Sequence, residues 1–89
     1  MPKKEVKGEF EGNTFEVLNT WKDGLKLFRN GDLIEHNQDK ISVSKNKPII
    51  SKTITIDNAD RIVEVFVYAV FRVKIQIKID GVKIAGDKF

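Results

Sequence analysis

The segment from Val63 to Ile79 carries an apolar residue at every odd position. Successive side chains of a β-strand point to opposite faces, so a period of two over this length predicts strand rather than helix. Elsewhere, no window of eleven or more residues combines the apolar spacing of an amphipathic helix with a capping residue. We therefore expect the chain to be all-β.

The same segment is too long for one straight strand of a small domain. Seventeen residues at about 3.3 Å each span roughly 56 Å. We expect a bend or bulge near Ala69–Arg72, or a strand that passes from one sheet into the other. Beyond that point the even positions are polar, which predicts one solvated face. These positions are Arg72, Lys74, Gln76 and Lys78.

Turn signals divide the rest of the chain into short strands. Asn30-Gly31 is the strongest of them, because a type I′ hairpin turn requires positive φ at both central residues. Glu11-Gly12-Asn13 and Asp80-Gly81 predict two further hairpins, and residues 57–60 predict a four-residue turn. The expected strands outside the long segment are Val6–Phe10, Thr14–Leu18, Leu25–Arg29, Asp32–Glu35, Ile41–Ser44, Ile49–Ile56 and Val82–Ala85.

An internal similarity occurs at an offset of fifty residues. Leu27, Asn30, Gly31 and Ile34 align with Ile77, Asp80, Gly81 and Ile84. This pattern indicates two similar halves, with chance similarity between two glycine turns as the alternative. The spacing of the glycine hairpins resembles the small β-sandwich repeats of the Fas apoptotic inhibitory molecule. That likeness covers a few turn residues and carries no function to this chain.

These patterns predict an antiparallel β-sandwich of about seven or eight strands, with two similar halves, or a partly closed barrel. The 89 residues are expected to form one domain, with residues 1–5 as a loose N-terminal tail. The predicted core is Phe10, Phe15, Val17, Leu27, Leu33, Ile54, Ile56, Val63, Val65, Val67, Phe71, Val73, Ile75 and Ile77.

The residue types needed for catalysis or metal binding are scarce. The chain has no cysteine and a single histidine, His36, which we expect in a solvated loop. It contains no phosphate-binding glycine loop and no nucleophile elbow. Asp57, Asn58 and Asp60 offer oxygen ligands for calcium, but their spacing is more typical of a turn. We expect no catalytic residue, no cofactor and no metal site.

Charge gives one specific hypothesis about a ligand. The net charge is +3, with −1 in residues 1–44 and +4 in residues 45–89. Small β-barrels bind single-stranded nucleic acid by combining basic groups with exposed aromatic rings. The face with Arg72, Lys74, Gln76 and Lys78 is the candidate anion-binding surface. Trp21 and Phe28 are the aromatic residues expected to reach solvent, and Trp21 is the candidate platform for bases.

A solvated lysine face that discourages edge pairing, with Trp21 as a lid over one end of the sandwich, is the competing interpretation. Exposed strand edges also favour a protein partner or self-association by strand addition. We therefore predict a non-catalytic interaction module, with single-stranded nucleic-acid binding as the alternative. The sequence contains no stretch of about 18 apolar residues, so no membrane-spanning helix is predicted. We expect a cytoplasmic location.

Overall fold

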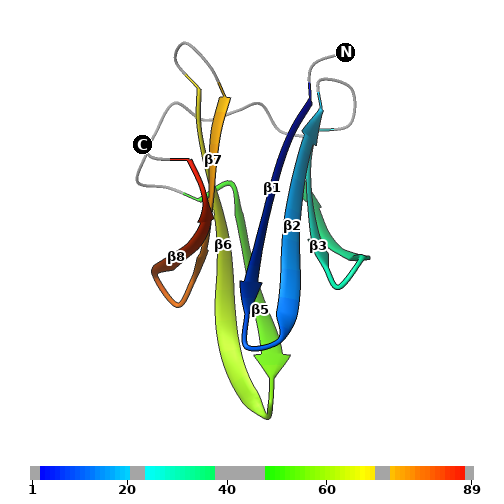
Figure 1. Cartoon of the computed structure of the whole chain (residues 1–89), viewed down its shortest axis with the longest axis vertical. Coiled ribbons are helices and arrows are strands. Elements are labelled where there is room, and N and C mark those ends of the chain that lie inside the picture. Colours follow the sequence, from blue (N-terminus) through cyan, green and yellow to red (C-terminus); the bar gives the residue numbers. More distant parts are fainter. Residues whose placement is uncertain (1–2, 21–23, 38–47, 70–72, 88–89) are drawn as a thin grey trace.

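The computed structural model describes residues 3–20, 24–37, 48–69 and 73–87. These residues form eight β-strands in two four-stranded antiparallel sheets, and no helix occurs among them (Figure 1). The strands are β1 (Lys3–Phe10), β2 (Asn13–Thr20), β3 (Gly24–Arg29), β4 (Asp32–Asn37), β5 (Ile50–Ile56), β6 (Ala59–Ala69), β7 (Val73–Ile79) and β8 (Val82–Gly86). Strand β1 begins at Lys3, before the expected start at Val6. The expected strand Ile41–Ser44 lies outside the described residues.

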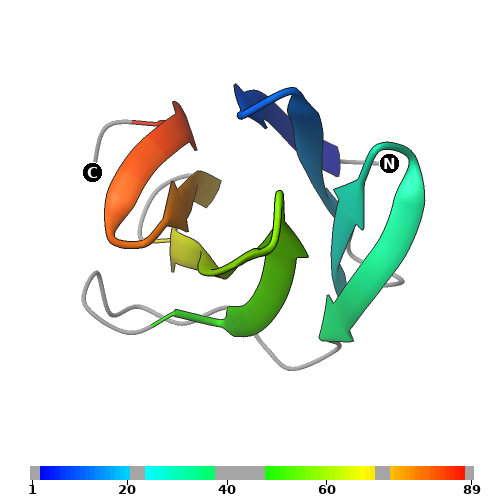
Figure 2. The same cartoon turned by 90° about the horizontal axis from the view of Figure 1, so that it is seen from below.

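Each sheet is a meander of four consecutive strands. The N-terminal sheet has the order β1-β2-β3-β4 and the C-terminal sheet the order β5-β6-β7-β8. Viewed from one end, the two sheets face each other, with β1 beside β8 and β4 beside β5 (Figure 2). The pairings between described strands do not join the sheets into a closed barrel. The predicted all-β sandwich is therefore confirmed.

Four tight turns connect the strands within hairpins. Both turn residues have positive φ in every case, between 48° and 89°, as type I′ turns require. The four turns are Glu11-Gly12, Asn30-Gly31, Asp57-Asn58 and Asp80-Gly81. The prediction of a four-residue turn over residues 57–60 is wrong, because Ala59 and Asp60 already pair with β5.

The alternating segment is two strands rather than one. Strands β6 and β7 run antiparallel within the C-terminal sheet, with Ala69 opposite Val73 and Val65 opposite Ile77. The expected bend or sheet-to-sheet passage is therefore wrong, since the chain reverses direction. Three residues separate Ala69 from Val73, so odd positions pair with odd positions. The odd-numbered residues therefore face the core in both strands, and the alternation in the sequence continues unbroken through the reversal of the chain.

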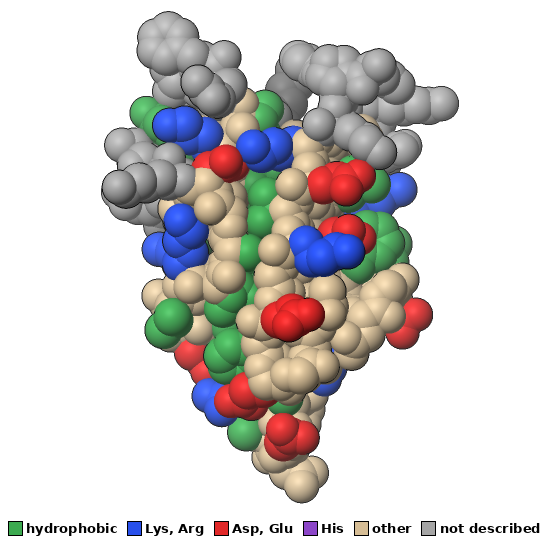
Figure 3. Space-filling view, in the orientation of Figure 1, with side chains coloured by type: hydrophobic (Ala, Val, Ile, Leu, Met, Phe, Trp, Pro, Cys, Tyr) green, Lys and Arg blue, Asp and Glu red, His purple; other side chains and the backbone are tan. Residues whose placement is uncertain are grey.

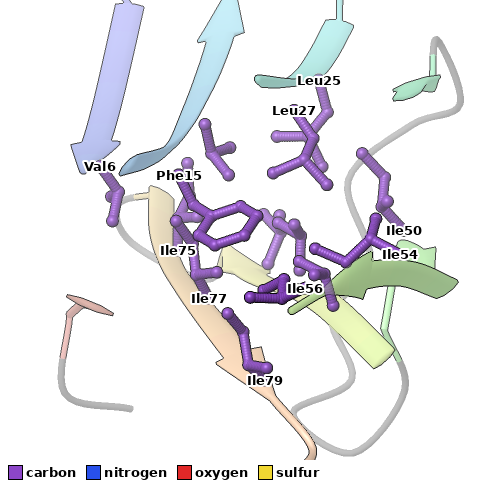
Figure 4. Packing of buried hydrophobic residues seen from close by; sticks show 14 residues of the cluster. Val6, Phe15, Leu25, Leu27, Ile50, Ile54, Ile56, Ile75, Ile77 and Ile79 are labelled. Carbon is purple, nitrogen blue, oxygen red and sulfur yellow. The ribbon is translucent and has the colours of Figure 1, made fainter. Parts of the chain in front are cut away.

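The core lies between the two sheets and draws on both of them. Phe15, Val17 and Leu27 of the N-terminal sheet are fully buried against Val63 and Ile77 of the other sheet and their neighbours (Figure 4). The buried set also includes residues that the sequence prediction left out. These are Val6, Leu25, Ile50, Ile79 and Phe66.

Three of the predicted core positions differ in the structure. Leu33 is 51% exposed, so its assignment to the core is wrong. Phe10 and Val73 are partly buried at the margin of the core. Phe71 lies outside the described residues.

The two halves share the same strand register. Leu27 lies opposite Glu35 and Phe28 opposite Leu33, and fifty residues later Ile77 lies opposite Ala85 and Lys78 opposite Lys83. A β-bulge interrupts both ladders at the same step. The extra residue is Ile34 in β4 and Ile84 in β8, and both pack against the core. The predicted similarity of the halves is therefore confirmed by their pairing.

Equivalent hydrogen bonds tie the Asn30-Gly31 and Asp80-Gly81 turns to the neighbouring strands. The Thr14 amide donates to Asn30 Oδ1 at 2.9 Å, and the Asn30 amide donates to the Thr14 carbonyl at 2.8 Å. In the second half, the Ile62 amide donates to Asp80 Oδ1 at 3.0 Å, and the Asp80 amide to the Ile62 carbonyl at 2.9 Å. Asparagine and aspartate thus serve the same local purpose, because each supplies a side-chain acceptor.

Strands β1 and β8 approach each other closely at one side of the sandwich. A Cβ atom on Gly8 would lie 2.6 Å from Ala85 Cβ, so any larger residue would force β1 and β8 to move apart. Nearby, Lys4 Nζ lies 3.1 Å from the Asp87 carboxylate. Figure 3 shows hydrophobic side chains in a line down this side, between the two sheets.

The opposite side is linked at its two ends. Asn37 Nδ2 donates to the Ile49 carbonyl at 3.0 Å, and Arg29 donates to the Thr55 carbonyl at 3.1 Å. Both bonds cross from the N-terminal sheet to β5 or the residue before it. Polar contacts thus hold the two sheets together at each edge of the sandwich.

Candidate functional site

The predicted anion-binding face is only partly within the described residues. Lys74, Gln76 and Lys78 lie on the outer face of β7, whereas Arg72 and Trp21 lie outside the described residues. Gln76 is 9% exposed, and its Nε2 donates to the Asp87 carbonyl at 2.7 Å. The expectation of a solvated face is therefore wrong at Gln76, whose amide is engaged within the fold.

Two aromatic residues of β6 lie on this face: Phe66, which is covered, and Tyr68, which lies opposite Lys74 and is half-buried. Phe66 lies opposite Gln76 and is 7% exposed. Lys78 Nζ sits 4.8 Å from the centre of the Phe66 ring, a cation–π contact. Glu64 lies opposite Lys78 and brings a negative charge to the same row. A ring buried in this way offers little surface on which a base could stack.

The charge of the described C-terminal half is balanced. Of the nine basic residues in 45–89, five are described, and all five acidic residues of that half are described. The remaining four basic residues are Lys45, Lys47, Arg72 and Lys88. The positive excess found in the sequence therefore comes from residues outside the described part.

The outer face of the N-terminal sheet presents an apolar pair. Phe28 of β3 lies directly opposite Leu33 of β4, and both point away from the core, because neighbouring Leu27 points into it. Phe28 is half-buried and Leu33 is 51% exposed. Leu18 of β2 lies diagonally beside Phe28, since its neighbour Glu16 is opposite Phe28. We call Leu18, Phe28 and Leu33 the outer apolar cluster.

The C-terminal sheet shows that the fold does not require apolar residues at the positions of Phe28 and Leu33. Lys78 and Lys83 form the cross-strand pair equivalent to Phe28 and Leu33, at the same step beside the bulge. The same backbone frame thus carries two lysines in one sheet and Phe and Leu in the other. Ile62 and Val82 of the C-terminal sheet are also exposed, at 47% and 64%, but Leu33 is paired with a second outward-facing apolar residue, Phe28.

A polar cluster joins the sheets at the turn end of the sandwich. Arg61 of β6 donates to Asp80 at 2.9 Å and to Glu11, in the β1–β2 turn, at 3.1 Å. Its guanidinium also lies 5.5 Å from the centre of the Phe10 ring. Among the described side chains, Arg61 Nε is buried without a hydrogen-bond partner. Both carboxylates are already paired with the guanidinium, so the cluster acts as a clamp rather than an open site.

Two carboxyl groups have pKa values shifted by these contacts. The Ile62 amide, followed by the Arg61 guanidinium, holds the pKa of Asp80 below its ordinary value. The hydrogen bond with Asp80 in turn raises the pKa of Arg61. For Asp87, burial raises the pKa, but the Ile75 amide and the Lys4 ammonium outweigh it and lower the pKa overall. Each shift favours the ionised carboxylate in the folded protein.

The structure places the sequence candidates His36 and Asp60 outside any metal-binding cluster among the described residues. His36 lies within β4, opposite Lys26, and not in the expected loop; it is exposed, as expected. Its amide donates to the Glu35 carboxylate at 3.1 Å. Asp60 accepts a hydrogen bond from the Thr55 hydroxyl at 3.0 Å. No group of three or more His, Cys, Asp and Glu in the described ranges is placed to hold a metal ion.

The four edge strands carry features that discourage pairing with another chain. Bulges distort β4 and β8, and β1 lies close against β8. In β5, Lys52 lies opposite the buried Val63 and so places a charge on the core side of the edge. Inward charges and bulges are common protections of exposed edges. Strand addition, the expected mode of association, therefore has less support than contact through a sheet face.

Comparison with protein families, curated proteins and solved structures finds no match to this chain. No helix that could cross a membrane is present in the described part of the protein.

The sequence analysis did not identify Leu33 as a surface residue and assigned it to the core instead. The fifty-residue offset contained the signal, since it aligns Leu33 with Lys83 and Phe28 with Lys78.

Proposed function

We propose that this protein is a non-catalytic interaction module that binds a partner protein through the outer apolar cluster. The observation that carries the proposal is the pair Phe28–Leu33, which is apolar and outward-facing where the equivalent pair is Lys78–Lys83. A partner with an apolar patch of its own would remove Leu33 and the exposed part of Phe28 from water on binding.

Polar groups surround the cluster and would define the rim of the interface. Glu16 lies opposite Phe28, and its carboxylate is 3.8 Å from Lys7. Lys26 lies opposite Leu18 on the same face. Interfaces of this kind combine a small apolar centre with a polar, solvent-accessible rim. The rim charges are mixed, so apolar burial is expected to dominate the affinity.

Single-stranded nucleic-acid binding through Lys74 and Lys78 has less support. Of the two rings on this face, Phe66 is buried and Tyr68 is half-buried, and the described charges of this half are balanced. The proposal includes a cytoplasmic location, which the lack of cysteine in the chain favours.

The test uses a variant that copies the second half of the protein. Phe28→Lys with Leu33→Lys gives the N-terminal sheet the residue pair that the C-terminal sheet carries, so the fold is expected to persist. Lys78→Ala with Lys83→Ala is the matched control on the opposite face. Parent, variant and control are compared in capture from a cell lysate, and each captured protein is then titrated into isotope-labelled parent and followed by NMR.

The proposal predicts a protein that the parent and the control capture but the Phe28→Lys/Leu33→Lys variant loses. Its titration should shift resonances of β2, β3 and β4 and saturate. Equal capture by all three proteins would contradict the proposal. Shifts confined to β6–β8 would contradict it as well and would favour the basic face.

A further inference from the structure

Asn30 and Gly31 form the exposed turn at the free end of the β3–β4 hairpin (Figure 1). Asparagine followed by glycine is the sequence most prone to deamidation, because the next backbone nitrogen attacks the side-chain amide and glycine has no Cβ to shield that nitrogen. The β3–β4 ladder ends at the pair Arg29–Asp32, so the Gly31 amide lies outside it. A Cβ on Gly31 would meet no described atom within 4 Å. The attacking nitrogen is therefore neither engaged in the ladder nor crowded.

The hydrogen bonds of the Asn30 side chain suit the same reaction. The Thr14 amide donates to Asn30 Oδ1 at 2.9 Å. Attack on Cγ moves negative charge onto Oδ1, and a fixed donor at this distance stabilises that charge as an oxyanion hole does. The side-chain nitrogen, Nδ2, donates to Asn13 Oδ1 at 3.0 Å. The fold thus supplies a donor to the atom that gains charge in the reaction.

The C-terminal sheet shows that the product of deamidation fits the turn. Asp80 and Gly81 occupy the equivalent turn, with φ values of 51° and 83° against 52° and 89° for Asn30 and Gly31. The Ile62 amide donates to Asp80 Oδ1, as the Thr14 amide does to Asn30. Asp80 itself is a poor target for attack, because its carboxylate is paired with Arg61 at 2.9 Å and carries a negative charge.

We infer that Asn30 is a site of spontaneous deamidation in the folded protein, and that the fold retains the aspartate product. The Gly31 nitrogen loses its proton to solvent and bonds to Asn30 Cγ. The Cγ–Nδ2 bond breaks, and ammonia leaves with a proton from solvent. Water then opens the succinimide ring, returns a proton to the Gly31 nitrogen and leaves aspartate, or isoaspartate if it attacks the other carbonyl. No oxidation occurs, and the net charge of +3 falls by one.

Incubation of the folded protein in water enriched in heavy oxygen tests the inference, because ring opening places one solvent oxygen in the new carboxyl group. Peptide mapping by mass spectrometry locates the label. Asn58 is the matched internal control, since it is also exposed and has positive φ in a hairpin turn, but Ala59 follows it. A second sample in denaturant gives the rate in the unfolded chain.

We expect residue 30 of the folded protein to take up label several-fold faster than Asn58, and no more slowly than in denaturant. Label at residue 30 in denaturant alone would overturn the inference, because the turn would then protect Asn30. Equal labelling of Asn30 and Asn58 would overturn it as well. Asn30→Asp, made directly, should unfold cooperatively and keep the native NMR position of the Thr14 amide. Loss of the native spectrum in this variant would contradict retention of the product. The test does not depend on the proposed partner surface.

Discussion

Gly8 is the position at which a single added methyl group should force the two sheets apart. A Cβ at this residue would lie 2.6 Å from Ala85 Cβ and 3.1 Å from the Ile84 carbonyl oxygen. Ordinary carbon–carbon contact begins near 3.5 Å, so the edges would have to separate by about 1 Å. Both nearest atoms belong to backbone or to a short side chain, and neither can rotate away.

The effect of Gly8→Ala on the free energy of unfolding is the sum of two opposing contributions. Overpacking a close contact typically costs about 1–3 kcal/mol. Replacing glycine by alanine within a strand recovers about 0.5–1 kcal/mol of backbone entropy. Gly8→Ala should therefore destabilise the protein by up to about 2.5 kcal/mol. For a domain of this size, this corresponds to a fall in Tm of up to about 20 °C.

The compensating variant makes the reasoning testable. Ala85→Gly removes the methyl group that the new Cβ would meet. The double variant Gly8→Ala/Ala85→Gly therefore has one methyl group between β1 and β8, as the parent has. Chemical denaturation of the parent, both single variants and the double variant gives the coupling energy between the two sites. We expect a favourable coupling of at least about 1 kcal/mol. Additive effects of the two substitutions would refute the argument that steric contact between β1 and β8 favours glycine at position 8.

The equivalent core residues Leu27 and Ile77 are both fully buried, so Leu27→Ala and Ile77→Ala should each cost about 2–5 kcal/mol in denaturant melts. A loss below about 1 kcal/mol for either would contradict its place in the core. The pKa of Asp80 is lowered in the folded protein, so its stabilising effect is present above the ordinary value of 3.8 and is lost as the pH falls through the folded value. Asp80→Asn should keep the acceptor for the Ile62 amide, as Asn30 does for Thr14, and should weaken the dependence of Tm on pH below about 4. An unchanged pH profile would contradict this role.

The sequence predicted the fold class because local and global signals agreed. Alternation in Val63–Ile79 identified strand structure and the core face, and Asn30-Gly31 and Asp80-Gly81 located two hairpins. The reversal between β6 and β7 was missed because a three-residue connection preserves the phase of the alternation. Leu33 was misplaced because the two-residue Asn30-Gly31 turn pairs it with Phe28, which faces outward.

The outer apolar cluster was less accessible to sequence reasoning. Recognising it requires the pairing of Phe28 with Leu33 and a comparison with Lys78 and Lys83 in the same register. The burial of Gln76 likewise depends on its bond with the Asp87 carbonyl, a contact between neighbouring strand ends. Periodicity assigns residues to faces, but it does not determine which outward-facing residues other groups cover.

The claim that Phe28 and Leu33 serve binding rather than folding is tested most directly by thermal unfolding of Phe28→Lys/Leu33→Lys beside the parent. The lysine pair already occurs in the equivalent place, and Leu33 is mainly exposed, so we expect a cooperative transition and a loss of less than about 2 kcal/mol. A loss as large as that of Leu27→Ala, or the absence of a cooperative transition, would contradict the claim and assign the pair to the fold.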